Sequence, residues 1–117
     1  MEDDEDVLEA ITLILTTHGS AEVIPAKTID EAKSKWREPV DAVLVDIMLP
    51  ETSVDETCRY VAEVRAKCPI VVGMTAGPES WLQKVERAGA KATLKKPLDM
   101  DDLLNVLKVN GDGDRGN

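Results

Sequence analysis

The sequence predicts an α/β domain built on a parallel β-sheet with helices on both faces, and three observations support this. Apolar runs at residues 43–45 and 70–74 are continuous instead of alternating, which is typical of central strands buried on both sides. Segments with helical periodicity alternate with these strands. The connections between them are short, and a strand–helix–strand alternation with short connections is typical of parallel strands joined by crossover helices. With 117 residues, the chain has the length of one domain.

The first elements are a helix and a short strand. The chain begins with an acidic run at residues 2–6, and a predicted helix from Val7 to Leu15 follows, which Gly19 ends as a C-cap glycine. Negative charge stabilises a helix N-terminus, so a solvated cap explains part of this run. Five consecutive acids exceed that need, and a binding role stays open. Residues 21–26 predict a strand near a sheet edge, because Pro25 has no N–H to donate.

A helix and a buried strand come next. Thr28 and Glu31 form a capping-box pattern that predicts the start of the helix. The strand over residues 42–46 ends in Asp46, and Pro50 indicates that a loop follows it. On this stretch alone, Asp46 is explained equally well as a turn-capping residue.

The second half of the chain repeats the alternation of helix and strand. The predicted elements are a helix over residues 54–67, a strand over residues 69–75, a helix from Glu79 or Ser80 to Gly89, a strand over residues 92–96 and a last helix capped by Asp99. Residues 110–117 are rich in Gly and Asp and predict a disordered tail.

The composition argues against two classes of partner. There are 23 acidic and 14 basic residues, and the formal net charge of −9 repels nucleic acid and anionic membranes. No apolar run approaches the length of a membrane span, and the acidic start is unlike a secretory signal. We therefore expect a cytoplasmic protein.

Three polar residues end three of the predicted strands: Asp46, Thr75 and Lys96. The carboxyl ends of parallel strands meet at one edge of the sheet, so these side chains should converge there with the acidic run. Each alone is commonly a turn or solvated residue. Together they match a known chemistry, in which carboxylates bind Mg²⁺, a lysine neutralises a phosphoryl group and an aspartate attacks it.

These residues stand in motifs that resemble the receiver domain of two-component response regulators, the CheY-like domains. The motifs are Glu2-Asp3 before the first helix, residues 45–50 (Val-Asp-Ile-Met-Leu-Pro), Met74-Thr75-Ala76, and Gly89-Ala90 leading to Lys96-Pro97. The resemblance implies a flavodoxin-like, doubly wound parallel sheet of strand order 2-1-3-4-5. It also implies a receiver domain over residues 1–109, truncated at its N-terminus relative to the family.

The same resemblance implies a role for each site residue. Asp46 would be the phosphoacceptor, Thr75 would sense the phosphoryl group and Lys96 would pair with it. The metal ligands for Mg²⁺ would be Glu2, Asp3, Asp46 and the backbone carbonyl of Met48. The phosphoryl group would come from a histidine kinase or a phosphotransfer protein, and its arrival would switch binding to a downstream partner. Such a domain is a signalling switch and not a turnover enzyme.

Three positions depart from the family pattern. An apolar first strand should precede the acidic pair, and here the sequence opens at Met1. The alternatives are a trimmed or misassigned start, a strand supplied by another chain in a homodimer or strand exchange, and a sheet with fewer strands. Thr93 stands where the family has Tyr or Phe, so the signal would run instead through the loop after Thr75 towards Trp81. Val54 replaces a common glycine, so the turn there should differ.

Two other functions remain as alternatives. A pseudo-receiver would bind proteins without phosphotransfer, because the first strand and the switch aromatic are absent. A Mg²⁺-dependent phosphatase with Asp46 as nucleophile fits less well, since such chemistry generally has a second acid where Met48 stands. We expect either a stand-alone receiver or a piece of a larger regulator, because no further domain follows the last helix.

Overall fold

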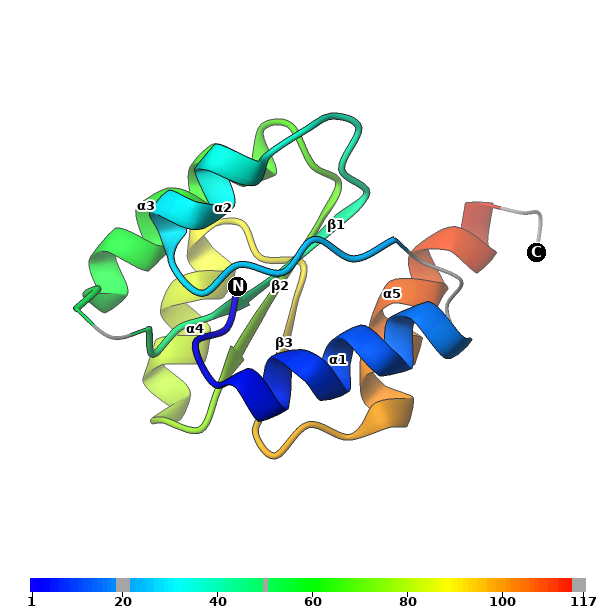
Figure 1. Cartoon of the computed structure of the whole chain (residues 1–117). Coiled ribbons are helices and arrows are strands. Elements are labelled where there is room, and N and C mark those ends of the chain that lie inside the picture. The colour runs from blue at the N-terminus through cyan, green and yellow to red at the C-terminus, as the bar shows by residue number, and fades with distance from the viewer. Residues whose placement is uncertain (19–21, 50, 115–117) are drawn as a thin grey trace.

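The computed structural model describes residues 1–18, 22–49 and 51–114, and these form a parallel α/β layer structure (Figure 1). In chain order the elements are α1 (Glu5–His18), α2 (Ile29–Lys35), β1 (Ala42–Asp46), α3 (Val54–Arg65), β2 (Ile70–Thr75), α4 (Glu79–Ala88), β3 (Ala92–Lys95) and α5 (Met100–Asp114). The predicted alternation of helices and parallel strands is confirmed.

The sheet of the described residues has three strands in the order β1-β2-β3. Both pairings are parallel, with Asp46 in register with Met74 and Thr75 in register with Lys95. All six residues of β2 are buried, as its continuous apolar sequence predicts for a central strand. The carboxyl ends of the three strands therefore lie at one edge of the sheet, where Asp46, Thr75 and Lys96 are expected to converge.

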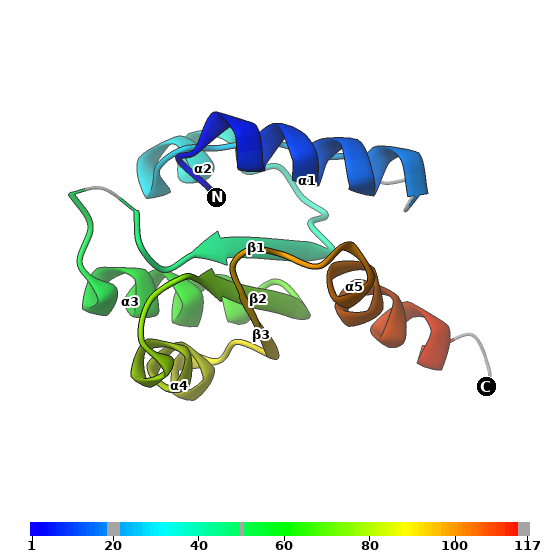
Figure 2. The same cartoon turned by 90° about the horizontal axis from the view of Figure 1, so that it is seen from below.

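Helices cover the two faces of the sheet and make two separate apolar clusters (Figure 2). On one face α3 and α4 pack Val61, Val64 and Val85 against β1 and β2. On the other face α1 and α5 pack Ile11 and Leu103 against β2 and β3. The sheet is thus buried on both sides by its crossover helices, which is the doubly wound arrangement.

Side chains that cap helices explain where several elements begin. The Thr28 hydroxyl accepts a hydrogen bond from the Glu31 N–H at the start of α2, at 3.0 Å. Ser53 and Glu56 form a reciprocal capping box at α3. Asp99 accepts hydrogen bonds from the N–H groups of the first turn of α5. These caps confirm the two helix starts that the sequence predicts at Thr28 and Asp99.

The strand predicted over residues 21–26 is wrong for the described part, residues 22–26, which carry no strand assignment. Of this segment, the Ala26 carbonyl accepts a hydrogen bond from the Glu2 N–H at 2.9 Å. A strand needs a hydrogen-bonded neighbour along its length, and the neighbour of this segment consists of Met1 and Glu2. Pro25 also has no N–H to donate. Ala21, Gly19 and Pro50 lie outside the described residues.

Two residues stand where the resemblance places a first strand. The Met1 N-terminal nitrogen donates to the Leu44 carbonyl at 2.5 Å, and the Asp46 N–H donates to the Met1 carbonyl at 2.9 Å. The Glu2 N–H donates away from β1, to the Ala26 carbonyl. Met1 and Glu2 therefore bridge β1 and the segment at residues 22–26, so that the acidic pair is held at the sheet edge.

The bounds of several elements differ from the predictions by one or two residues. The helix predicted over residues 54–67 ends at Arg65, and the strand predicted over residues 92–96 ends at Lys95. A larger difference is at the carboxyl end, where α5 extends to Asp114 and includes residues 110–114 of the predicted tail. Residues 115–117 lie outside the described residues.

Candidate functional site

The three strand-end residues converge at the carboxyl edge of the sheet. Asp46 ends β1 and Thr75 ends β2, and both are buried. Lys96 follows β3 directly, and its backbone N–H donates to the Thr75 carbonyl at 3.0 Å. The convergence expected from the parallel order is therefore present.

Asp46 is held in one orientation by groups on both of its carboxylate oxygens. Its Oδ1 accepts a hydrogen bond from the Met48 N–H at 2.9 Å, within the turn that follows the strand. Its Oδ2 accepts from the Lys96 ammonium at 3.0 Å. Asp46 is 3% exposed, so little of this carboxylate is open to solvent.

Lys96 also binds Glu2, which is almost fully buried. The ammonium donates to Glu2 Oε1, and the other oxygen, Oε2, accepts from the Asp4 N–H at 3.2 Å. One lysine thus lies between two buried carboxylates, which come from the first and the second of the predicted motifs. Its charge offsets the repulsion between them.

The electrostatics of this triad follow from burial and from these contacts. Burial raises the pKa of Glu2 above its ordinary value, and the hydrogen bond from Lys96 opposes this. Burial lowers the pKa of Lys96, but its hydrogen bonds to Glu2 and Asp46 outweigh it, so the pKa is raised. The lysine is therefore held in its charged form.

Carboxylates of the site are close enough to share a cation. Oxygen atoms of Glu2, Asp3 and Asp46 lie within 4.8 Å of one another. Oxygen ligands in such a group are those that Mg²⁺ and Ca²⁺ take in proteins. Asp4 has a different role, since its Oδ1 accepts from the Asp6 N–H at 2.9 Å at the start of α1. The acidic run is thus divided between a helix cap and the site.

Thr75 faces the site from the central strand. Its hydroxyl oxygen accepts a hydrogen bond from the Gly77 N–H at 2.9 Å, and its side chain is fully buried. The indole ring of Trp81 lies against Gly77, because a Cβ built there would be 2.8 Å from Trp81 Cε3 and 3.2 Å from Met48 Sδ. The loop after Thr75 thereby links the site to a partly exposed aromatic side chain.

Met1 is a site residue that sequence reasoning did not single out. Its backbone fixes the end of β1 through Leu44 and Asp46, and its amino group is buried. Burial lowers the pKa of this amino group to about 6. These contacts are made by the backbone, so no residue type in the sequence signals them.

The chain is a doubly wound α/β domain with clustered carboxylates and a lysine at the carboxyl ends of its strands, which is the arrangement that the resemblance to receiver domains implies. The family model described as response regulator receiver domain matches residues 1–108. The chain belongs to this family, which serves two-component signalling. Both the flavodoxin-like fold and the recognised family are confirmed.

Individual relatives agree with the family. The chain is 27% identical over 95 residues to chemotaxis protein CheY of Bacillus subtilis, covering 80% of this chain and 79% of CheY. It is 31% identical over 105 residues to the uncharacterized transcriptional regulatory protein YrkP of the same organism, covering 88% of this chain and 44% of YrkP. The chain therefore spans less than half the length of that relative.

Solved structures show the same fold. A CheY-like receiver domain protein from Methanospirillum hungatei superposes with a TM-score of 0.82 at 28% identity, covering 96% of this chain and 90% of that chain. A response regulator from Thermotoga maritima gives a TM-score of 0.77 at 25% identity, covering 93% and 91%. Among the described residues, no helix is both long and apolar enough to cross a membrane.

Proposed function

We propose that the chain is a phosphoacceptor domain that receives a phosphoryl group on Asp46 in the presence of Mg²⁺ and thereby switches the binding of a partner. Membership of the receiver family and the carboxylate group around Asp46 support this. The donor would be a histidine kinase or a phosphotransfer protein in the cytoplasm. The domain would act as a switch and would not turn over a substrate.

Glu2, Asp3 and Asp46 fit a hard divalent cation, because three carboxylates offer oxygen ligands within a short distance. The Met48 carbonyl, in the turn after Asp46, would be a fourth ligand. When bound, Mg²⁺ would neutralise charge on the phosphoryl oxygens. Because Lys96 now lies between Glu2 and Asp46, we expect it to release Glu2 and retain contact with the phosphoryl group.

The chemical step is a transfer between two nucleophiles. An Asp46 carboxylate oxygen forms a bond to phosphorus while the bond from phosphorus to the imidazole nitrogen of the donor histidine breaks. The electron pair of the broken bond stays on that nitrogen. Lys96 and the Thr75 hydroxyl would bind oxygens of the transferred group. The Thr75 hydroxyl accepts from the Gly77 N–H and would donate to a phosphoryl oxygen, so its turning towards the phosphoryl group would strain the bond from Gly77 and move the loop that carries the switch.

The single observation that carries this proposal is the pairing of buried Asp46 with Lys96 beside Glu2. The test is incubation with Mg²⁺ and a small phosphodonor, followed by intact-mass measurement of the parent and Asp46→Asn. The parent should gain one phosphoryl group and the variant none. A parent without any mass gain, but still able to bind a partner, would point to a pseudo-receiver instead.

A further inference from the structure

The side chain of Met48 lies on the surface beside the candidate site. Met48 is 48% exposed, and its backbone N–H donates to Asp46 Oδ1 at 2.9 Å. The proposed function uses only the backbone of this residue, so its thioether has no part in phosphotransfer. A thioether is polarisable, and peroxides oxidise it to a sulfoxide. Met48 thus places an oxidisable group next to the phosphoacceptor.

The four methionines of the chain differ in their access to solvent. Met74 is fully buried and Met1 is half-buried, whereas Met48 and Met100 are 48% and 44% exposed. Oxidation requires access to the sulfur, so the two exposed residues should react first. Met100 begins α5, where it lines a hollow beside α1. It is therefore a matched control for the effect of exposure alone.

The two cysteines are poorer targets for peroxide. Cys68 is buried and Cys58 is half-buried. Burial raises the pKa of both thiols, so both stay protonated, whereas the thiolate is the reactive form. Oxidation of this chain should therefore fall first on the exposed methionines.

The Met48 thioether packs on the loop that follows β2. A Cβ built on Gly77 would be 3.2 Å from Met48 Sδ and 2.8 Å from Trp81 Cε3. The thioether and the indole ring thus converge on one glycine, where the absence of a side chain lets both approach. The Gly77 N–H in turn donates to the Thr75 hydroxyl at 2.9 Å. A change at the Met48 sulfur therefore reaches the loop that joins Thr75 to Trp81.

We propose that the Met48 thioether is a site of oxidation by peroxide, and that its sulfoxide displaces the loop at Gly77 and Trp81. A sulfur lone pair attacks one oxygen of hydrogen peroxide, so that a sulfur–oxygen bond forms while the oxygen–oxygen bond breaks. The proton of the transferred hydroxyl passes to the departing hydroxide, which leaves as water. The sulfur loses two electrons and the peroxide gains them.

The product no longer suits the contact that the thioether makes. A sulfoxide oxygen is polar and needs a hydrogen-bond donor, which the carbon edge of an indole ring does not offer. An oxygen on the Gly77 side would push Gly77 or Trp81 away, and otherwise the whole side chain has to turn out of the contact. Either movement exposes the Trp81 ring to water. Methionine sulfoxide reductases restore the thioether, so the change is reversible.

Oxidation would thereby give the loop a second input. The consequence for signalling rests on the proposed function, because phosphorylation would act on the same loop through Thr75. The oxidation and the movement of Trp81 do not rest on it, since they need neither a metal ion nor a phosphodonor. The two can therefore be tested separately.

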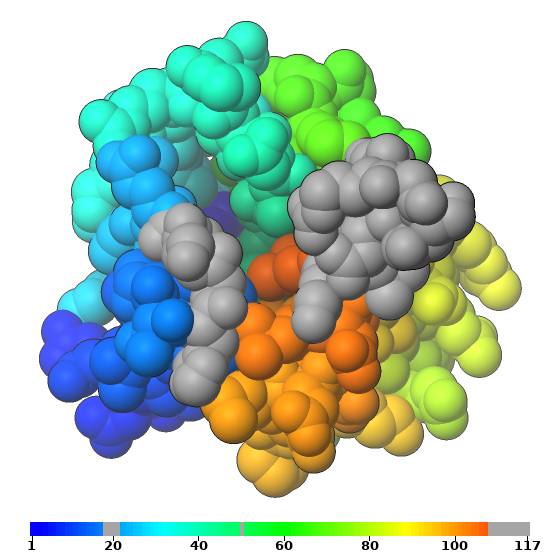
Figure 3. Space-filling view, turned by 90° about the vertical axis from the view of Figure 1, so that its right-hand side faces the viewer, coloured from blue at the N-terminus to red at the C-terminus, as the bar shows by residue number. Residues whose placement is uncertain are grey.

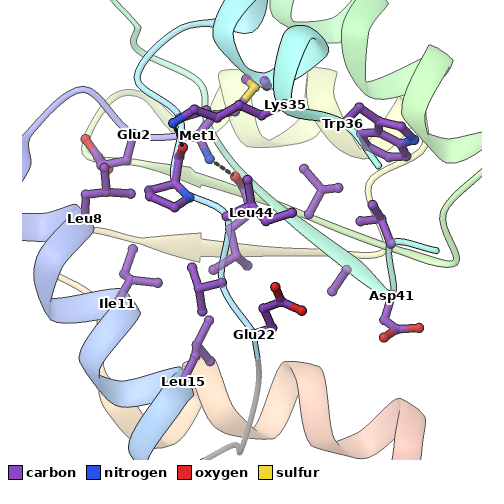
Figure 4. A pocket seen from close by; sticks show the side chains of 18 of the residues that line it. Met1, Glu2, Leu8, Ile11, Leu15, Glu22, Lys35, Trp36, Asp41 and Leu44 are labelled. Carbon is purple, nitrogen blue, oxygen red and sulfur yellow. Dashed lines mark hydrogen bonds between the residues drawn. The ribbon is translucent and has the colours of Figure 1, made fainter. Parts of the chain in front are cut away.

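Trp81 reports on this loop once the other tryptophan, Trp36, is replaced. Trp36 lines a cavity of about 540 Å³ along β1, where Figure 4 shows it among the lining side chains. Figure 3 shows the surface hollowed at this place. Trp36→Phe therefore removes a fluorophore that would report on that cavity instead of the loop.

The test treats metal-free Trp36→Phe protein with hydrogen peroxide and maps each methionine by peptide mass spectrometry. Met48 should be oxidised about ten-fold or more faster than Met74, and at a rate similar to that of Met100. Trp81 emission should shift to longer wavelength in step with Met48 oxidation. Treatment with methionine sulfoxide reductase should reverse the shift. Failure of Asp46 to accept a phosphoryl group would leave these results unchanged.

Two further variants in the same background assign the signal. Met48→Leu keeps an apolar side chain of similar size that peroxide does not oxidise, so its Trp81 emission should not respond to treatment. Met100→Leu should show the full shift. Each variant is compared with its own untreated sample. A shift that persists in Met48→Leu, Met48 sulfoxide without any shift, or Met48 oxidation no faster than that of Met74 would overturn the proposal.

Discussion

At the scale of single residues, the site depends on one lysine shared by two buried carboxylates. Lys96 donates to Glu2 and to Asp46, and both acids are almost removed from solvent. Uncompensated charge in such a place is costly, and the Lys96 ammonium offsets the charge of the two carboxylates. The same residues that would conduct phosphotransfer therefore also set the stability of the metal-free protein.

Replacement of Lys96 by methionine should lower the free energy of unfolding at pH 7 by about 2 kcal/mol, a value reduced from that of fully buried pairs because the lysine is partly exposed. Urea denaturation measures it. Added Mg²⁺ should recover part of the loss, since a cation between the carboxylates replaces the ammonium. Lys95→Met is the control, because Lys95 is exposed. Equal stability of the two variants would contradict the account.

The buried Met1 amino group predicts a pH dependence. Its pKa is about 6 in the folded chain and 8.0 as its ordinary value. Between these values the unfolded chain binds more protons, so the free energy of unfolding should rise from pH 6 to pH 8, by about 2 kcal/mol. Denaturation of metal-free protein at both pH values measures the rise. Nα-acetylated protein should lack it, and identical pH profiles would refute the assignment.

At the scale of elements, the loop between β2 and α4 connects the site to the surface. The Gly77 N–H bonds to the Thr75 hydroxyl, and the Trp81 ring covers Gly77 next to Met48. We therefore expect a change in the Thr75 rotamer to alter the position of Gly77 and the environment of Trp81. Because Thr93 stands where the resemblance implies an aromatic residue, we expect the signal to pass along this loop.

This route predicts a fluorescence signal. In the Trp36→Phe variant, Mg²⁺ and beryllofluoride should change Trp81 emission, because the Thr75 hydroxyl turns from Gly77 to the phosphoryl mimic. Thr75→Val should bind the mimic with little change in emission. The Trp81→Phe variant, which keeps Trp36, is the control. A change that survives in Thr75→Val would show that the loop is not driven by this hydroxyl.

Elements differ in how far the sequence predicts them. The strands β1 and β2 and the helix starts at Thr28 and Asp99 are predicted well, because continuous apolar runs and caps are local signals. Full burial is found for β2, whereas residues 42–44 of β1 are half-buried. The strand at residues 21–26 is not predicted well, because pairing depends on a neighbour elsewhere in the chain. The convergence of Asp46, Thr75 and Lys96 follows from the parallel order. The backbone role of Met1 has no local signal at all.

At the scale of the whole molecule, the chain is compact around its three-stranded sheet. The radius of gyration is 13.3 Å, equal to the value of about 13 Å expected for a folded domain of this length. Helices on both faces of the sheet and the bridge at Met1 and Glu2 hold the layers together. The formal net charge of −9 favours attraction of a divalent cation to the acidic edge.

The most direct test of the central claim is beryllofluoride binding followed by ¹⁹F nuclear magnetic resonance. This mimic of a phosphoryl group binds only where an aspartate, a divalent cation and the phosphoryl-binding side chains come together. In the presence of Mg²⁺ we expect protein-bound fluorine resonances for the parent and none for Asp46→Asn or after removal of Mg²⁺. Bound resonances in Asp46→Asn, or their absence from the folded parent, would contradict the assignment of Asp46 as the phosphoacceptor.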